Sequence, residues 1–61
     1  MKYAAVIYNY WNVVIRVEER PTRERAVKAG VFFTGLKNHS GAWYQVVEGG
    51  DVDFYKALIN A

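Results

Sequence analysis

Residues 3–18 read YAAVIYNYWNVVIRVE, and this stretch decides the fold. Two runs rich in β-branched and aromatic residues, Tyr3–Tyr8 and Val13–Glu18, flank a short gap bracketed by Asn9 and Asn12. Strands favour such residues, and asparagine is common in the tight connections of hairpins. The stretch therefore predicts a β-hairpin.

Period-two alternation assigns the hairpin side chains to two faces, provided that Tyr8 lies opposite Val13. One face then carries only apolar side chains, namely Ala4, Val6, Tyr8, Val13, Ile15 and Val17. The other face carries Tyr3, Ala5, Ile7, Val14, Arg16 and Glu18. We expect the first face to form the core and the second to leave an apolar patch of Tyr3, Ile7 and Val14.

A helix is predicted after the hairpin. Pro21 cannot donate to a strand ladder, and Thr22 is a favourable N-cap residue. From Arg23 to about Lys37 the apolar residues recur with helical spacing, in a stripe of Ala26, Ala29, Phe33 and Leu36. Gly30 lies at the edge of this stripe, which predicts a close approach of the helix to the sheet.

The remaining residues predict a turn at Lys37–Gly41, a third strand at Ala42–Glu48, and a short helix at Val52–Asn60. The order is β-β-α-β-α in a single domain spanning residues 1–61. We expect an α+β fold with a three-stranded antiparallel sheet. The first strand is central, because Tyr3–Tyr8 is almost continuously apolar. The first helix should pack on the core face, and the second should lie beside it or cover the other face.

The chain contains ten aromatic residues among 61, one histidine and no cysteine. A domain of this size buries only roughly 60% of its unfolded surface, so its core cannot hide ten large rings. Disulfides and a structural zinc site, which stabilise many small domains, are excluded by this composition. We therefore expect some rings to remain exposed until a partner or a second copy of the chain covers them.

The sequence offers no catalytic, cofactor-binding or metal-binding set, so we do not expect an enzyme. His39 stands beside Ser40 in a turn, where adjacent side chains point apart and cannot form a dyad. Asp51 and Asp53 are explained by helix capping and solvation. The pair Gly49-Gly50 lacks the lysine and further glycines of a phosphate-binding loop.

Basic residues gather in the middle of the chain, although the net charge is only +2. Arg20, Arg23 and Arg25 cluster at the start of the predicted helix, with Arg16 on the strand before it. Positive charge near a helix N-terminus is unfavourable, which suggests that these arginines serve a partner. The alternative is a solvated face that is partly neutralised by neighbouring acids, namely Glu18, Glu19 and Glu24.

Tyr10 and Trp11 are the most unusual feature, because hairpin tips normally carry Gly, Asn or Asp. Exposed rings at this position suit an anchor that enters a protein pocket, or a platform for stacking bases. The alternative is that Trp11 folds back over the second helix.

The β-β-α-β pattern, with a helix that reads Thr22-x-x-x-Ala26-Val27-x-x-Gly30, resembles very small phage-encoded proteins that bind host components. These include inhibitors of host RNA polymerase, CRISPR interference and toxins. The resemblance covers Tyr3–Val47 and is one of topology, and the terminal helix departs from it. It implies stoichiometric protein binding and assigns no individual residue a role.

The sequence thus predicts a small cytoplasmic protein that binds and inhibits or modulates a larger protein bearing an acidic patch. The expected contact residues are Tyr3, Ile7, Tyr10, Trp11, Val14, Arg16, Arg20, Arg23 and Arg25. A nucleic-acid-binding protein that uses the same arginines and rings is the alternative, and a homodimer paired through strand edges is a third hypothesis. No cofactor and no membrane association are expected.

Overall fold

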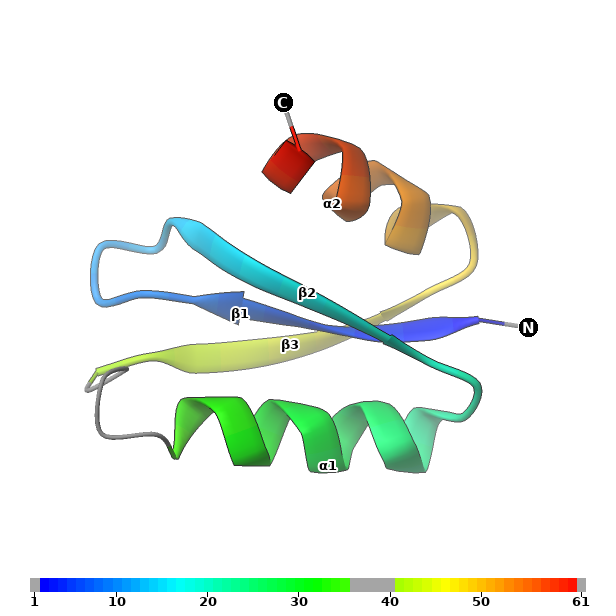
Figure 1. Ribbon diagram of the computed structural model, residues 1–61, viewed down its shortest axis with the longest axis horizontal. Helices are drawn as coiled ribbons and strands as arrows, with labels where there is room; N and C mark the ends of the chain where they lie inside the picture. The colour runs from blue at the N-terminus through cyan, green and yellow to red at the C-terminus, as the bar shows by residue number, and fades with distance from the viewer. Residues whose placement is uncertain (1, 36–40, 61) are drawn as a thin grey trace.

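The computed structural model describes residues 2–35 and 41–60, which form a three-stranded sheet and two helices (Figure 1). The elements are β1 (Tyr3–Tyr8), β2 (Val14–Arg20), α1 (Arg23–Thr34), β3 (Trp43–Glu48) and α2 (Gly50–Asn60). The strands are antiparallel in the order β2-β1-β3. The predicted α+β fold with a central first strand is confirmed.

The two helices cover opposite faces of the sheet, α2 on one side and α1 on the other (Figure 1). Ala29 of α1 packs with Ala5 and Ile7, whereas Val52 of α2 packs with Ala4 and Val6. The expectation that the first helix covers the Ala4 and Val6 face is wrong. Alternation along a strand shows which side chains share a face, but both faces of β1 are apolar and either could receive α1.

The hairpin register also differs from the prediction. Tyr8 lies opposite Val14, and a bulge places Ile7 opposite Arg16, so that Ile15 has no partner on β1. A bulge of one residue reverses the facing of the side chains beyond it. Val14 therefore joins Val6 and Val17 on the α2 face, while Ile15 and Val13 remain exposed.

α1 begins at Arg23 as the sequence predicts and buries the predicted stripe residues Ala26 and Ala29, but it ends at Thr34, earlier than the expected Lys37. The Thr22 side chain caps its N-terminus by accepting a hydrogen bond from the Arg25 backbone N–H at 3.2 Å. Gly30 lies directly against Tyr44 of β3, so that an added Cβ would overlap the ring. This close approach is the one expected from Gly30. The other predicted stripe residue, Leu36, lies outside the described residues.

Two ion pairs fasten α2 to the sheet. Lys2 Nζ lies 2.7 Å from Asp53 Oδ1, and Lys56 Nζ lies 2.8 Å from Glu19 Oε1. The hydrogen bond with Lys2 lowers the pKa of Asp53 and raises that of Lys2. The hydrogen bond from Lys56 likewise lowers the pKa of Glu19. Because all four groups lie at the surface, these bonds position α2 more than they stabilise the fold.

The buried core is small and contains no aromatic ring. It consists of Ala4, Ala5, Val6, Ile7, Ala26, Ala29, Val47 and Val52. All ten aromatic residues lie in the described part of the chain, and every one of them retains solvent contact. The expectation that this interior cannot hide its rings is confirmed, and the molecule carries them at its surface.

Candidate functional site

The apolar strand face expected at Tyr3, Ile7 and Val14 does not exist as a surface. Ile7 is completely buried beneath α1, so its prediction as a contact residue is wrong. Val14 is half-buried on the opposite face of the sheet, because the bulge in β2 turns it toward α2. Tyr3 lies on the face of the sheet that α1 covers, and its side chain is half-exposed.

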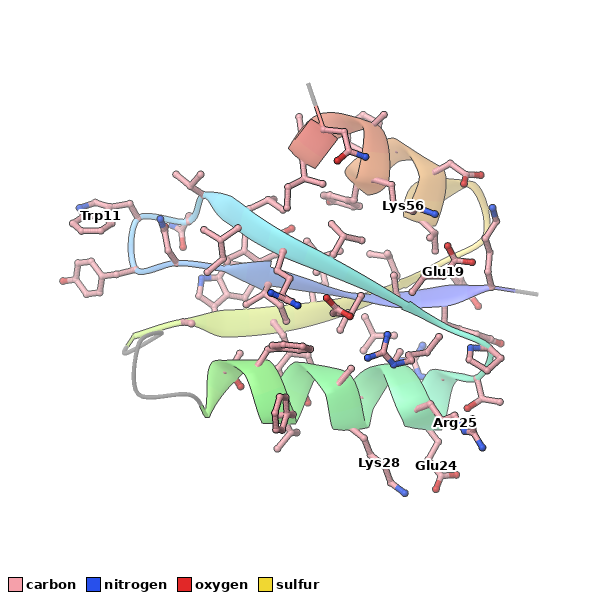
Figure 2. The ribbon with its side chains drawn as sticks, in the orientation of Figure 1. Trp11, Glu19, Glu24, Arg25, Lys28 and Lys56 are labelled. Carbon is pink, nitrogen blue, oxygen red and sulfur yellow. The ribbon has the colours of Figure 1, made fainter. Side chains whose placement is uncertain are left out.

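The hairpin tip, in contrast, projects into solvent. The side chain of Trp11 is 77% exposed and that of Tyr10 is 73% exposed, the two largest values among the described large apolar residues. Their rings meet edge to face, with centroids 5.7 Å apart. Trp11 points away from the body of the protein and does not fold back over α2 (Figure 2).

Two asparagines hold the tip in one conformation. Asn9 Oδ1 accepts hydrogen bonds from the backbone N–H groups of Trp11 at 2.8 Å and Val13 at 3.0 Å. Asn12 adopts a φ of 64°, a left-handed conformation that asparagine tolerates better than most residues. The Oδ1 atom of Asn12 also accepts a hydrogen bond from Trp43 Nε1 at 2.9 Å. The exposed rings are thus carried by an ordered loop.

Trp43 extends this aromatic surface from the tip onto the sheet. Its ring stacks on that of Tyr8, with centroids 4.1 Å apart and planes inclined by 8°. The Tyr8 hydroxyl donates to Gln45 Oε1 at 3.1 Å. Burial, followed by the neighbouring Tyr55 hydroxyl, raises the pKa of Tyr8 to about 12, so it stays a neutral donor.

We call this region the aromatic end, and define it by the side chains of Tyr8, Tyr10, Trp11, Val13 and Trp43. The segments 8–15 and 41–47 that form it contain no charged residue. Cores of protein–protein interfaces show the same combination of aromatic enrichment and charge depletion. Trp43 was not among the predicted contact residues, because a tryptophan in a strand is normally a core residue.

A second surface is a groove between α1 and β2, with a volume of about 370 Å³. Its lining combines three apolar residues, Ala29, Phe32 and Phe33, with three cationic residues, Arg20, Arg25 and Lys28. Gly30 lies against Tyr44 on the β3 side of α1, and the groove opens on the β2 side of the same helix. We call it the basic groove.

Glu18 organises the arginines along the groove. One carboxylate oxygen accepts from Arg16 Nε at 2.6 Å and the other from Arg20 Nη1 at 3.2 Å. The guanidinium of Arg16 lies 4.1 Å from the centroid of the Phe33 ring, a cation–π contact. Within the described residues, Arg25 has no ion pair, so its charge faces the groove uncompensated.

Lys28 and Phe32 are contributors that the sequence did not single out as contact residues. Lys28 lies 3.7 Å from Glu24 in a pair that is largely exposed on both sides, which leaves its charge available to a ligand. Phe32 is 62% exposed and meets Phe33 edge to face. Its position outside the apolar stripe of α1 was the signal that could have identified it.

The predicted contact residues therefore do not form one surface. Trp11 and Arg25 lie at opposite ends of the molecule's long axis, which is 31 Å in extent (Figure 2). Arg16, Arg20 and Arg25 belong to or border the basic groove, while Tyr10 and Trp11 belong to the aromatic end. Arg23 is exposed in the first turn of α1 and does not line the groove.

Residues 2–35 and 41–60 contain no group of three His, Asp or Glu side chains that could hold a metal ion. His39 and Ser40 lie outside these ranges. Within the same ranges, no helix has the length and apolar character needed to cross a membrane. Neither protein-family models, curated proteins nor solved structures give a match to this chain.

Proposed function

We propose that this protein is a protein-binding module that acts on a larger protein as a stoichiometric modulator, with the aromatic end as its docking surface. The observation that carries the proposal is the exposure of Tyr10 and Trp11 on an ordered, uncharged loop. Tryptophan and tyrosine dominate the energetic centres of protein interfaces. Such rings are costly to expose unless a partner covers them.

Order in the loop matters for affinity. Binding by a mobile loop costs about 0.5–1.5 kcal/mol for each side chain that must be immobilised. Here the hydrogen bonds of Asn9 and Asn12 hold the backbone before any partner arrives. The two rings can therefore contribute most of their burial energy to the complex, and we expect each to be worth about 2 kcal/mol or more.

The basic groove supports an acidic partner surface. Arg25 and Lys28 retain accessible positive charge, and Arg25 lies at the other end of the 31 Å long axis from Trp11. A partner that contacts both surfaces must therefore extend along most of this chain. Charges at the periphery of an interface mainly accelerate association and contribute less to final affinity. Raising the salt concentration should therefore slow association, with little effect on dissociation.

The test compares two exposed rings. Immobilised wild-type protein is incubated with an extract of the source cells, and the retained proteins are identified by mass spectrometry. Trp11→Ala should lose the specific partner, and Phe54→Ala should retain it, because Phe54 is 61% exposed on α2 and is not part of the aromatic end. If both variants capture the same proteins as the wild type, the aromatic end is not the docking surface.

Nucleic-acid binding is the second candidate, and the basic groove is the observation that favours it. Single-stranded nucleic acids bind where cationic side chains follow the backbone and aromatic rings stack with bases. Arg20, Arg25 and Lys28 supply the cations, and Phe32 supplies an accessible ring. The acids Glu18 and Glu24 interleave with these cations and would repel phosphates.

Salt dependence separates the two candidates. Fluorescence anisotropy with a labelled single-stranded oligonucleotide should show a steep loss of affinity between low and moderate salt if the groove binds phosphates. Arg25→Glu should then abolish binding, whereas Trp11→Ala should leave it unchanged. Weak binding that is insensitive to Arg25→Glu would reject the nucleic-acid candidate and leave the protein-binding proposal standing.

A further inference from the structure

The two edges of the sheet are built differently. β2, at one edge, carries four charged residues (Arg16, Glu18, Glu19 and Arg20) and the bulge next to Ile15. Charges and bulges are the devices by which proteins prevent unwanted pairing at a sheet edge. β3, at the other edge, reads WYQVVE, pairs regularly with β1 and has no charge before Glu48. Of the two described edge strands, β2 carries these protective features and β3 does not.

The backbone groups on the free edge of β3 follow from its pairing with β1. The Gly49 N–H donates to the Lys2 carbonyl at 2.9 Å, which makes these two residues a hydrogen-bonded pair. Such pairs alternate along an antiparallel ladder, so residues 43, 45 and 47 also direct their N–H and C=O groups toward β1. The corresponding groups of Tyr44, Val46 and Glu48 point outward, ready to pair with another strand.

We propose that a second copy of this chain pairs antiparallel with β3, about a two-fold axis at Gln45, to form a continuous six-stranded sheet. In this register Tyr44 lies opposite Val46 of the partner subunit, and Trp43 lies opposite Val47 of the partner subunit. Pairs of an aromatic with a β-branched residue are favourable across strands. Glu48 lies opposite Ala42 of the partner subunit, so no like charges oppose each other.

The position of α1 favours a second copy of this chain as the partner that pairs with the β3 edge. α1 lies over β1 and β3, as the contacts of Ala29 with Ile7 and of Gly30 with Tyr44 show. Strands pair at about 4.8 Å, so the two α1 helices of the dimer would run about 10 Å apart, a normal helix-packing distance. Val31, which is 57% exposed, lies on the β3 side of α1 together with Val27, and would face the partner helix.

The area suits a dimer of moderate affinity. The contact strip would be about 20 Å long and similarly high, which corresponds to roughly 600 Å² of accessible surface per subunit, near the lower limit for specific interfaces. It would also enlarge a core that contains no aromatic ring. The basic groove lies beside β2, and Tyr10 and Trp11 lie at the hairpin tip, so the pairing leaves these uncovered. Trp43, on β3, is the member of the aromatic end that the pairing would contact.

Sedimentation equilibrium tests the proposal. Wild-type protein should shift with concentration from one chain of 7.0 kDa to twice that mass. Gln45 meets its own copy on the axis, so Gln45→Lys and Gln45→Glu should each weaken the dimer at least tenfold through repulsion. An equimolar mixture of the two variants should restore a dimer that contains one copy of each.

The control is Ile15→Lys, which adds the same charge at the β2 edge and should leave the dimer unchanged. Amide hydrogen exchange of the wild type provides a readout that needs no variant. The Tyr44, Val46 and Glu48 amides should exchange more slowly as the protein concentration rises. A wild type that stays monomeric at millimolar concentration overturns the proposal, as does a dimer that both Gln45 variants retain.

The inference is independent of the proposed function. Gln45→Lys should remain able to capture a partner through the aromatic end, and Trp11→Ala should still dimerise. If Trp11→Ala abolishes the dimer, the self-association runs through the aromatic end and the β3 pairing is rejected.

Discussion

Gly30→Ala tests the packing of α1 against the sheet. The added Cβ would overlap the Tyr44 ring, with Cε2 at 2.8 Å and the atoms nearest the strand closer still. Those atoms belong to the base of the side chain, so the ring can yield only if α1 or β3 also moves. Overpacking of this kind costs about 1–3 kcal/mol.

The helix itself would gain from the same change, because alanine is favoured over glycine in a helix by about 1 kcal/mol. Because the overlap reaches the base of the Tyr44 ring, the upper part of the overpacking range applies, about 2–3 kcal/mol. After subtraction of the helix gain of about 1 kcal/mol, we expect Gly30→Ala to lower the free energy of unfolding by about 1–2 kcal/mol. The change in the free energy of unfolding is measured by urea denaturation, with circular dichroism as the signal. All variants should be compared at one low protein concentration, so that self-association does not contribute.

Two controls isolate the cause. Gly50→Ala adds a methyl group at the start of α2, where nothing lies within 4 Å, and should be close to neutral. In a Tyr44→Ala background the space is free, so Gly30→Ala should become stabilising by about 0.5–1 kcal/mol. If Gly30→Ala alone leaves stability unchanged or raises it, the close approach of α1 to Tyr44 is not what holds this helix.

Two further predictions concern pH. Because the pKa values of Asp53 and Glu19 are lowered in the fold, their stabilising contribution is present above the ordinary values of 3.8 and 4.5 and is lost as pH falls through the lower folded values. The protection factors of the α2 amides should therefore fall in acid before those of β1 do, and a uniform loss of protection would contradict this. The folded pKa of Tyr8 is raised from 10.0 to about 12, so its neutral form stabilises the protein below pH 10 and this contribution is lost between those values. Absorbance at 295 nm should show one late tyrosine transition, which Tyr8→Phe should remove.

The secondary structure followed from local physical rules. The apolar character of Tyr3–Tyr8 indicated a central strand, and Pro21 with Thr22 indicated where a strand ends and a helix begins. These features act through neighbouring residues, so they can be recognised without knowledge of the rest of the fold. Gly30 similarly indicated a close contact, although not that Tyr44 would be its partner.

Local rules did not determine the assignment of faces, because both faces of β1 are apolar. The bulge next to Ile15 shifted Val14 to the α2 face. The local sequence does not reveal the bulge, since three similar β-branched residues, Val13, Val14 and Ile15, follow one another. A register is chosen by the whole sheet and by the helices packed on it, so a hairpin alone cannot reveal it. The predicted apolar patch was therefore wrong in two ways, because α1 covers Ile7 and the bulge turns Val14 toward α2.

The composition alone determined that aromatic rings must stay at the surface, because a chain this short has too little interior to enclose them. Only the tertiary structure decided which rings are the most exposed. It also decided that the arginines lie far from Trp11. Distances between segments depend on how the sheet and helices assemble. The aromatic end, the basic groove and the unprotected β3 edge are therefore properties of the folded molecule.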